Sequence, residues 1–319
     1  MLIGMSEADD FLRNCDNVYI LVHQSPDGDC IGSGFAIHSV LKDMGKRSAV
    51  LCSDDFLKKF DFITKTIENN PDFEPDTIIA VDVADIKLLG KYQEIYGGKI
   101  QLCIDHHVSN TGYAECTLLD SKASAACEVI YRLLVKEMRI EISDYTAMCL
   151  YTGIATDTGC FKYESTSAET HEIVAGIMRK HKLNYAKINR EMFDVKSAGR
   201  LKMESAVIDI MEYYLGGKVT VIAITKQLFD SLGIDSNDLD GCASLPLQVE
   251  GVEVGITIKE KAPDSYKISM RSTGDVNVSQ ICATLGGGGH AKASGCAIDG
   301  NLEDVKKILV EAVRKGMNL

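Results

Sequence analysis

The chain has 319 residues, of which 45% are hydrophobic and 25% are charged, and its formal net charge is −12. This length predicts about two domains, with cores large enough to fold without disulfides or a structural metal. The acidic charge argues against binding along long nucleic acids, which requires an extended basic surface. It still allows a short nucleotide to be held by a few local cations or by metal ions.

The apolar runs are short, and the N-terminus is acidic. Runs such as 18–22 and 78–81 fall far below the roughly 18 residues of a membrane span. The start MLIGMSEADD lacks the basic and apolar regions of a signal peptide. The eleven cysteines include no CxxC pair, so we expect reduced core thiols, with a zinc site or a catalytic thiol as the alternative. These features predict a cytoplasmic protein that does not contact membranes.

Short apolar runs alternate with helical patterns in the first half of the chain. The predicted strands are 18–22, 48–52, 77–81 and 99–104, and the predicted helices are 31–44, 123–137 and 143–155. Such alternation is typical of a mostly parallel, doubly wound α/β sheet with helices on both faces. Ligands of these sheets bind at the carboxyl ends of strands, so we expect the functional site there.

Polar helical segments follow from 167 to 214, and the α/β pattern restarts after Gly216 and Gly217. The charged, proline-free stretch 184–202 predicts a helical connector. The second half predicts strands at 218–224, 252–258 and 266–271, a glycine loop at 286–289 and an amphipathic helix at 302–313. We therefore predict a two-domain α/β protein with an active-site cleft between the domains. The predicted parts are an N-terminal domain (1–190), a helical linker (191–215) and a smaller C-terminal α/β domain (216–319).

Carboxylates and histidines gather in four clusters of the first domain. The segment HQSPDGDCIGS ends a predicted strand with His23 and brings Asp27 and Asp29 to the start of a helix. One imidazole and two carboxylates in a turn suit a hard divalent cation, and a surface turn with a helix cap is the alternative. In the second cluster Asp82 directly follows four apolar strand residues, where a buried carboxylate needs a partner, a metal or a capping role.

The third cluster is IDHHVSN, with Asp105, His106 and His107, and the fourth is TGIATDTGCF, with Asp157 at the end of an apolar helix. Adjacent histidines both face one site only where the chain turns, and a solvated pair is the alternative. A simple helix terminus is the alternative for Asp157. Because all four clusters can meet at one edge of one sheet, together they predict a metal site.

The ordered set of four segments resembles the motifs of the DHH phosphoesterase family. The second domain adds MRS at 270–272 and LGGGGHAKASGC at 285–296, which resemble the DHH-associated C-terminal domain. The resemblance covers nearly the whole chain. It is closest to the short members, namely nanoRNases, phosphatases for pAp and dinucleotide phosphodiesterases. Cys30 stands where the family usually has Ala, and the similar size of the two side chains predicts no consequence.

The resemblance implies two metal ions, Mn²⁺ or else Mg²⁺. By this resemblance the first ion is bound by His23, Asp27 and Asp82, and the second by Asp29, Asp82, His106 and Asp157. The residue chemistry agrees, because four carboxylates balance two divalent charges and oxygen-rich ligation favours Mn²⁺ over a thiolate zinc site. Such a pair of ions activates a water and clamps the attacking and leaving oxygens.

The remaining site residues are expected to serve the substrate. His107 would donate to the phosphoryl oxygen or the leaving group, and Asp105 would orient a histidine. The four glycines permit a nest of N–H groups around an anion, and a flexible hinge is the alternative. The expected substrate-binding residues are Arg271, Ser272, Gly287, Gly288, Gly289 and His290. Arg271 offers a fork for a terminal phosphate, with a surface salt bridge as the alternative.

The resemblance predicts a Mn²⁺-dependent phosphoesterase that releases 5′-mononucleotides from short oligoribonucleotides, removes the 3′-phosphate of pAp, or does both. A phosphodiesterase for cyclic or linear dinucleotides such as cyclic di-AMP is the alternative. An inorganic pyrophosphatase or exopolyphosphatase shares only the N-terminal motifs. A non-catalytic nucleotide-binding protein is expected to lack a metal ligand, and none is missing here. The expected partner is a short oligoribonucleotide or bisphosphonucleotide, and the sequence leaves a homodimer open.

Overall fold

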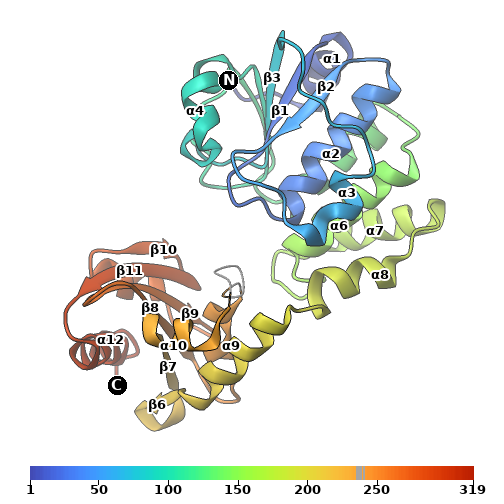
Figure 1. The fold of residues 1–319 in the computed structure, drawn as a ribbon. Coiled ribbons are helices and arrows are strands. Elements are labelled where there is room, and N and C mark those ends of the chain that lie inside the picture. Colours follow the sequence, from blue (N-terminus) through green and yellow to red (C-terminus); the bar gives the residue numbers. More distant parts are fainter. Residues whose placement is uncertain (235–238, 240) are drawn as a thin grey trace. The chain divides into compact units, whose positions relative to one another are not determined.

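The computed structural model describes residues 1–234, 239 and 241–319, and Figure 1 traces the course of the chain. The chain forms two compact units, Met1–Val195 and Lys196–Leu319. Each unit has its own sheet and its own hydrophobic core. Among the described helices, none has both the length and the apolarity that crossing a membrane requires.

The first unit is built around a parallel sheet with the strand order β2-β1-β3-β4-β5. Its strands are β1 (Val18–Leu21), β2 (Ser48–Leu51), β3 (Thr77–Val81), β4 (Leu102–Asp105) and β5 (Cys116–Leu119). Residues of β1 to β4 are buried on both faces, which explains why the sequence shows continuous apolar runs instead of alternation. The prediction of a parallel α/β sheet is confirmed.

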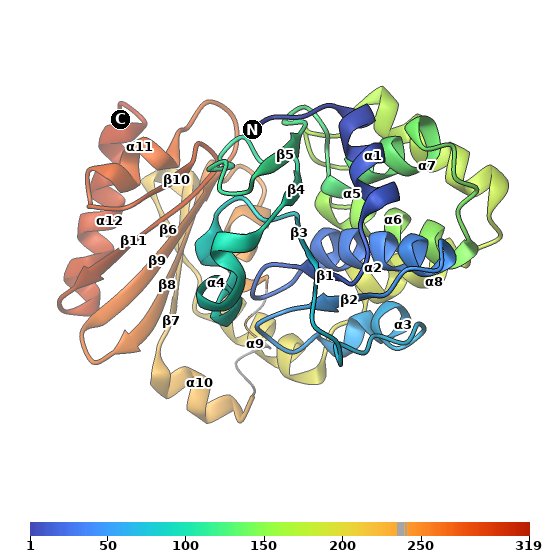
Figure 2. The ribbon, with the colours of Figure 1, turned by 90° about the horizontal axis from the view of Figure 1, so that it is seen from above.

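Helices cover both faces of this sheet (Figure 2). On one face, Ile20 and Ile79 pack into a core shared with several helices. These helices are α1 (Met5–Asn14), α2 (Gly28–Asp43), α3 (Asp61–Thr64), α5 (Ala126–Tyr131), α6 (Asp144–Asp157), α7 (Ala168–Lys180) and α8 (Tyr185–Asn189). On the other face, Tyr19 and Leu21 pack against the 3-10 turn Ile86–Leu89 and α4 (Lys91–Tyr96).

The strand order places a switch point between β1 and β3. From β1 the chain crosses to β2 at one edge, whereas from β3 it continues through β4 to β5 at the other edge. Ligands of open α/β sheets bind beyond the carboxyl ends of the strands at such a point. His23 lies just after β1 and Asp82 directly follows β3, so the fold brings both to this position.

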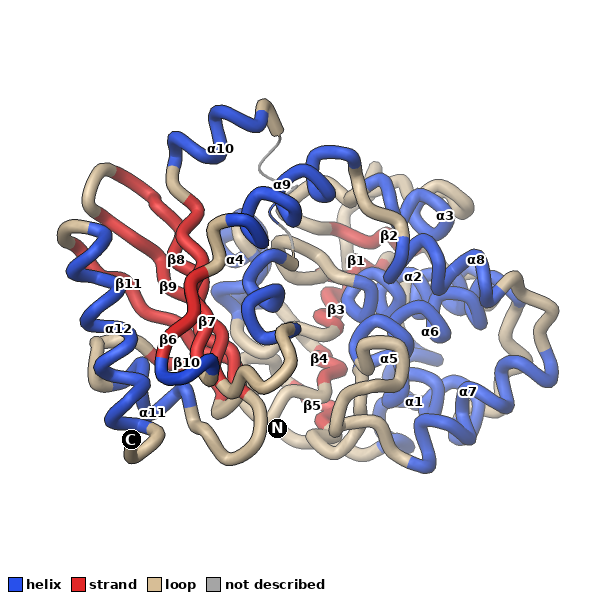
Figure 3. The backbone as a smooth tube through the Cα atoms, turned by 90° about the horizontal axis from the view of Figure 1, so that it is seen from below, coloured by secondary structure: helices blue, strands red, loops and turns tan. Residues whose placement is uncertain are grey.

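The second unit holds a mixed sheet with the order β10-β11-β9-β8-β7-β6, shown in red in Figure 3. Its strands are β6 (Glu212–Tyr214), β7 (Val219–Ile224), β8 (Val254–Ala262), β9 (Ser265–Ser272), β10 (Gly288–His290) and β11 (Ala293–Asp299). One face packs against α11 (Val278–Ala283) and α12 (Leu302–Gly316). The β7 end of the other face packs against α9 (Ala198–Asp209), and α10 (Lys226–Leu232) follows β7. This unit confirms the predicted second α/β fold.

Some segments differ from the sequence-based expectation. The predicted helical linker 191–215 ends in the strand β6, which pairs with β7. The predicted glycine loop is only partly a loop, because Gly288 and Gly289 enter β10 and pair with Gly295 and Ser294. Backbone pairing needs no side chain, so successive glycines do not prevent a hairpin. The predicted strand 99–104 begins only at Leu102, because Gly97–Lys99 forms a 3-10 turn.

Candidate active site

The first two clusters meet around the imidazole of His23. Its Nε2 atom lies 3.8 Å from Oδ1 of Asp27 and 3.8 Å from Oδ2 of Asp82. Asp27 caps the start of α2, where its Oδ1 accepts a hydrogen bond from the backbone N–H of Cys30 at 3.0 Å. The helix cap expected as an alternative for this turn is therefore present, and it holds the carboxylate next to His23.

The other clusters meet around the imidazole of His106. Its Nε2 atom lies 3.9 Å from Oδ2 of Asp29, 3.6 Å from Oδ1 of Asp82 and 3.4 Å from Oδ2 of Asp157. Asp82 therefore faces both histidines, with one carboxylate oxygen toward each. The structure brings all six predicted ligand residues together at one edge of the first sheet.

Backbone carbonyls determine which nitrogen each histidine turns toward the carboxylates. Nδ1 of His23 donates to the carbonyl oxygen of Gln24 at 2.8 Å, and Nδ1 of His106 donates to that of Ala123 at 3.2 Å. In both rings the lone pair is then on Nε2, which faces the carboxylates. Histidines that ligate metals are oriented in this way by a hydrogen bond on the other nitrogen.

The start of α5 holds the carboxylate of Asp29 in place. Oδ2 of Asp29 accepts a hydrogen bond from the backbone N–H of Ala126 at 2.6 Å, and Oδ1 accepts one from Cys127 at 2.9 Å. On the opposite side α6 needs a glycine, because a Cβ at Gly153 would lie 2.8 Å from Oδ1 of Asp29. Both oxygens are fixed before any ligand binds, and each keeps a lone pair for a cation.

Asp82 is the most constrained carboxylate of the site. Its side chain is 3% exposed, and its Oδ1 atom has no hydrogen-bond partner among the described residues. Its backbone φ of 56° lies in the left-handed region, where non-glycine residues persist mainly at functional sites. Burying a carboxylate oxygen without a hydrogen bond is costly unless a cation compensates. The observation fits a metal ion bound at Asp82.

Three of the clustered carboxylates have a raised pKa. Burial and repulsion by Asp29 and Asp27 raise the pKa of Asp82 well above its ordinary value, and the same causes raise that of Asp157 to about 8. Burial also raises the pKa of Asp29. Divalent cations would supply the positive charge that this group lacks. The donor atoms and their electrostatics therefore fit metal ions.

Asp105 and His107 lie beside this cluster. Asp105 is fully buried, and its Oδ1 accepts hydrogen bonds from Nδ1 of His107 and from the backbone N–H of His106, both at 2.8 Å. The chain turns directly after β4, so the two histidine rings lie 4.5 Å apart and both reach the site. The His107 side chain is 40% exposed, which leaves its Nε2 accessible to a substrate.

Asn110 belongs to the same hydrogen-bond network and was not among the predicted residues. Its Nδ2 donates to Oδ2 of Asp105 at 2.5 Å. The only signal in the sequence was its place in IDHHVSN, three residues after His107. A side chain that contacts a carboxylate across a turn leaves no periodic pattern, so sequence reasoning had no means of assigning it.

In the second unit, Arg271 and His290 lie in one row of the sheet. Ala293 of β11 lies opposite Arg271 of β9 and also opposite His290 of β10. Directly opposed residues point to the same face, so Arg271 and His290 share a face two strands apart. The neighbouring Met270 points to the other face, which packs on α11 and α12.

Two of the expected substrate-binding residues make contacts within the second unit and do not face a substrate. Ser272 is buried, and its hydroxyl donates to the carbonyl oxygen of Val276 at 2.7 Å. Gly287 packs so closely on Gly295 that a Cβ would overlap with its carbonyl oxygen. Neither residue presents a side chain on the face that carries Arg271.

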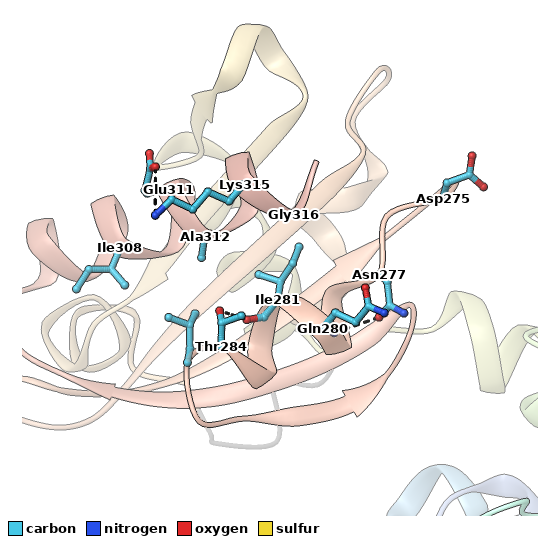
Figure 4. A pocket seen from close by; sticks show the side chains of 11 residues that line it. Asp275, Asn277, Gln280, Ile281, Thr284, Ile308, Glu311, Ala312, Lys315 and Gly316 are labelled. Atoms are coloured by element: carbon cyan, nitrogen blue, oxygen red, sulfur yellow. Dashed lines mark hydrogen bonds and ion pairs between the residues drawn. The ribbon is translucent and has the colours of Figure 1, made fainter. Parts of the chain in front are cut away.

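A separate hollow of about 660 Å³ lies between α11 and α12 (Figure 4). Gln280 and Ile281 line it on one side, and Glu311 and Lys315, which form an ion pair at 3.7 Å, line it on the other. None of the predicted site residues lines this hollow, and its lining holds no histidine. We therefore do not place the chemistry there.

Comparisons with known proteins match both units of the chain. Residues 17–154 match the DHH family, N-terminal domain, and residues 216–315 match the DHHA1 domain. The chain is 28% identical to a bifunctional oligoribonuclease and PAP phosphatase NrnA of Thermus thermophilus, over 93% of this chain and 89% of that protein. It is 26% identical to a cyclic-di-AMP phosphodiesterase GdpP of Geobacillus thermodenitrificans, over 95% of this chain and 48% of that protein.

One solved structure resembles the whole chain. The crystal structure of an exopolyphosphatase-related protein from Bacteroides fragilis matches with a TM-score of 0.87 and 26% sequence identity. The match covers 98% of this chain and 95% of that chain. Both sheets of the described fold therefore have counterparts in an experimental structure.

Proposed function

We propose that this chain, which matches the DHH family N-terminal domain over residues 17–154 and the DHHA1 domain over residues 216–315, is a Mn²⁺-dependent phosphoesterase for short nucleotides. It hydrolyses short oligoribonucleotides to 5′-mononucleotides and removes the 3′-phosphate of pAp. The observation that carries the proposal is the arrangement of two imidazoles around the shared carboxylate of Asp82. The relative named for these two activities is matched over most of its length, which supports this substrate class.

Hydrolysis of a cyclic or linear dinucleotide of the cyclic di-AMP type is the second candidate. The observation in its favour is the similarity to a cyclic-di-AMP phosphodiesterase. Because this chain spans only 48% of that relative, the similarity supports a shared catalytic part more than a shared substrate. We therefore rank this activity second.

We propose that the six ligand residues hold two cations, with Mn²⁺ as the preferred ion and Mg²⁺ as the alternative. His23 and Asp27 would hold one ion, Asp29, His106 and Asp157 would hold the other, and Asp82 would contact both. When bound, such a pair supplies a water of lowered pKa and positive charge for the phosphoryl oxygens. The hydrogen bonds that fix Asp29 mean that this carboxylate needs little reorganisation when the ions bind.

His107 is the proposed proton donor to the leaving oxygen. Its hydrogen bond to Asp105 raises the pKa of the imidazole, against the opposing effect of burial. A raised pKa keeps more of the ring protonated near neutral pH, which is the form that can act as an acid. Asp105 acts as a positioning residue, because it holds Nδ1 and leaves Nε2 to face the substrate.

The proposal also assigns a separate role to each domain. Residues 1–190 would carry the catalytic groups, residues 191–215 would connect, and residues 216–319 would bind substrate. Arg271 offers a bidentate fork for a terminal phosphate, and His290 lies in the same row of the sheet. Buried thiols such as Cys15 and Cys103 support the cytoplasm as the proposed location.

A substrate panel assayed with Mn²⁺ tests the proposed function. It contains pAp, a 5′-phosphorylated diribonucleotide, a long single-stranded RNA, cyclic di-AMP and pyrophosphate, compared by kcat/KM. The expected result is a preference for pAp and the diribonucleotide over the long RNA. A preference for cyclic di-AMP would establish the second candidate instead. Failure on every nucleotide by metal-loaded protein would overturn the proposal in favour of a binding protein.

A further inference from the structure

One thiol lies among the proposed metal ligands. The Sγ atom of Cys30, a ring nitrogen of His23 and a carboxylate oxygen of Asp82 all lie within 4.8 Å of one another. Zn²⁺ bonds sulfur at about 2.3 Å and imidazole nitrogen at about 2.0–2.1 Å, and tetrahedral geometry then places the two ligand atoms about 3.6 Å apart. The three atoms would therefore approach one another by up to about 1.2 Å to enter one coordination sphere. The similar sizes of Cys and Ala predict no consequence for packing, but they do not account for a sulfur atom near two metal ligands.

The local structure holds the sulfur on the side of the ligands. Cys30 lies in the first turn of α2, and its backbone N–H is bound to the carboxylate of Asp27. The residue is fully buried, so its side chain cannot turn to solvent. A second observation points to a cation at this place, because the carboxylate of Asp82 is only 3% exposed and its Oδ2 lies 3.8 Å from Nε2 of His23, where a buried negative charge needs compensation.

The two proposed metal positions therefore differ in their donor atoms. The position at His23 combines imidazole nitrogen, carboxylate oxygen and a nearby sulfur, whereas the position of Asp29, His106 and Asp157 has no sulfur in its group. Sulfur ligands favour thiophilic ions such as Zn²⁺, Co²⁺ and Cd²⁺, and oxygen-rich groups suit Mn²⁺ or Mg²⁺. We propose that Cys30 is a further ligand of the ion at His23, which gives this position a higher affinity for thiophilic cations than the position of Asp29, His106 and Asp157 has.

Binding of the ion by Cys30 exchanges one bond of the sulfur for another. A metal–sulfur bond forms, the S–H bond breaks and the proton passes to water or buffer. The inference rests on the proposed function only in assuming that a metal ion binds at His23, and it has a readout that does not depend on catalysis. Sulfur bound to Co²⁺ gives a charge-transfer absorption in the near ultraviolet that nitrogen and oxygen ligands do not give.

The test is a Co²⁺ titration of the metal-free, full-length protein, with bound metal measured by mass spectrometry. We expect the charge-transfer band in the unmodified protein, its loss in Cys30→Ala and Cys30→Ser, and its retention in Cys15→Ala, another buried thiol of the same core. Both Cys30 variants should bind Cd²⁺ at least about tenfold more weakly and keep their Mn²⁺ content at the other position. Cys30→Ser preserves size, so an unchanged melting curve and Mn²⁺ content separate loss of the sulfur from misfolding.

Other results of the Co²⁺ titration would overturn either the inference or the proposed function. A Co²⁺-loaded protein without the band, or a band of full strength in Cys30→Ala, would overturn the inference. Mn²⁺-dependent hydrolysis of pAp by the same preparation would show that the proposed function survives that failure. Protein that binds Co²⁺ with the band but hydrolyses no nucleotide would support the sulfur ligand and refute the proposed function.

Discussion

The Oδ1 atom of Asp105 lies 2.8 Å from Nδ1 of His107, and this hydrogen bond joins a fully buried carboxylate to a histidine that is 40% exposed. Although burial opposes ionisation of Asp105, its hydrogen bonds with His107 and Asn110 lower its pKa, so it stays charged. The same hydrogen bond raises the pKa of His107. The pair thus fixes both the orientation and the protonation of one ring.

The first prediction is that Asp105→Asn lowers kcat by about 10–100-fold while metal content stays unchanged. Asn keeps the size of Asp105 but removes the negative charge that favours the imidazolium. The pKa of His107 must then fall, so the alkaline limb of the kcat profile should move to lower pH. Measuring kcat and bound metal across pH checks this, and an unmoved alkaline limb would show that Asp105 has only a structural role.

His107→Ala is the companion variant for this prediction. It should lower kcat to a similar extent, and it should also retain its metal, because the proposed ligand nitrogens belong to His23 and His106. If metal is lost instead, His107 is a ligand. That result has a structural basis, since Nδ1 of His107 lies 3.5 Å from Oδ1 of Asp82.

The second prediction is that Asp82→Asn lowers activity and makes the metal-free protein more stable. Loss of the shared carboxylate should release bound Mn²⁺ and lower kcat/KM by more than about tenfold. The metal-free protein should at the same time gain about 1–3 kcal/mol in free energy of unfolding, because a neutral amide replaces a buried carboxylate among other carboxylates. Asn is also the side chain that best tolerates the φ of 56° at this position.

Asp85→Asn is a suitable control, because Asp85 caps a nearby turn through the backbone N–H of Lys87 and is not a proposed ligand. Denaturant unfolding of metal-free protein and metal analysis of purified protein provide the two readouts. A variant that keeps a tenth or more of the activity, or that is less stable than the unmodified chain, contradicts the role assigned to Asp82.

The sequence was most informative where a strand is buried and a polar residue follows it. The strand 77–81 was predicted with its observed bounds, and the Asp after it lies in the cluster as expected. The short edge strand β5 and the first helix α1 had no counterpart among the predicted elements. Four residues of an edge strand carry too little periodicity to be recognised without knowing their neighbours.

The orientation of the site residues could not be read from the sequence, because it depends on contacts between distant segments. The backbone N–H groups that hold Asp29 come from Ala126 and Cys127, 97 and 98 residues away. The buried position of Ser272 follows from the face alternation of β9, which becomes clear only once the helices packed on that sheet are known. The proximity of Cys30 to His23 and Asp82 is likewise a product of the fold.

The third prediction concerns Arg271 and the terminal phosphate. Arg271→Ala should raise KM for pAp by about 10–100-fold, because a charged hydrogen bond contributes about 1.5–3 kcal/mol. It should change kcat little, and it should hardly affect an aryl phosphoester without a second phosphate. Lys267→Ala is the matched control, since Lys267 lies on the same strand and the same face. Equal effects of Arg271→Ala on both substrates would refute the role in phosphate binding.

The last prediction is that the metal-free protein loses stability as pH rises. Burial and the charges of Asp29 and Asp27 raise the pKa of Asp157 to about 8 in the folded chain. The pKa of an aspartate in an unfolded chain is about 3.9. Between these values the folded chain binds more protons than the unfolded chain. The contribution of Asp157 to the free energy of unfolding must therefore fall with rising pH until about pH 8 and level off above it.

Thermal melts of chelated and Mn²⁺-loaded protein at several pH values check this prediction. Bound Mn²⁺ compensates the ionised carboxylates, so the gain in Tm on adding Mn²⁺ should be small near about pH 5 and should grow toward about pH 8. Asp157→Asn should reduce the pH dependence of the chelated protein, because it removes one of the groups whose pKa is raised. A chelated protein whose Tm rises over this range would mean that the carboxylates are compensated by something other than a cation.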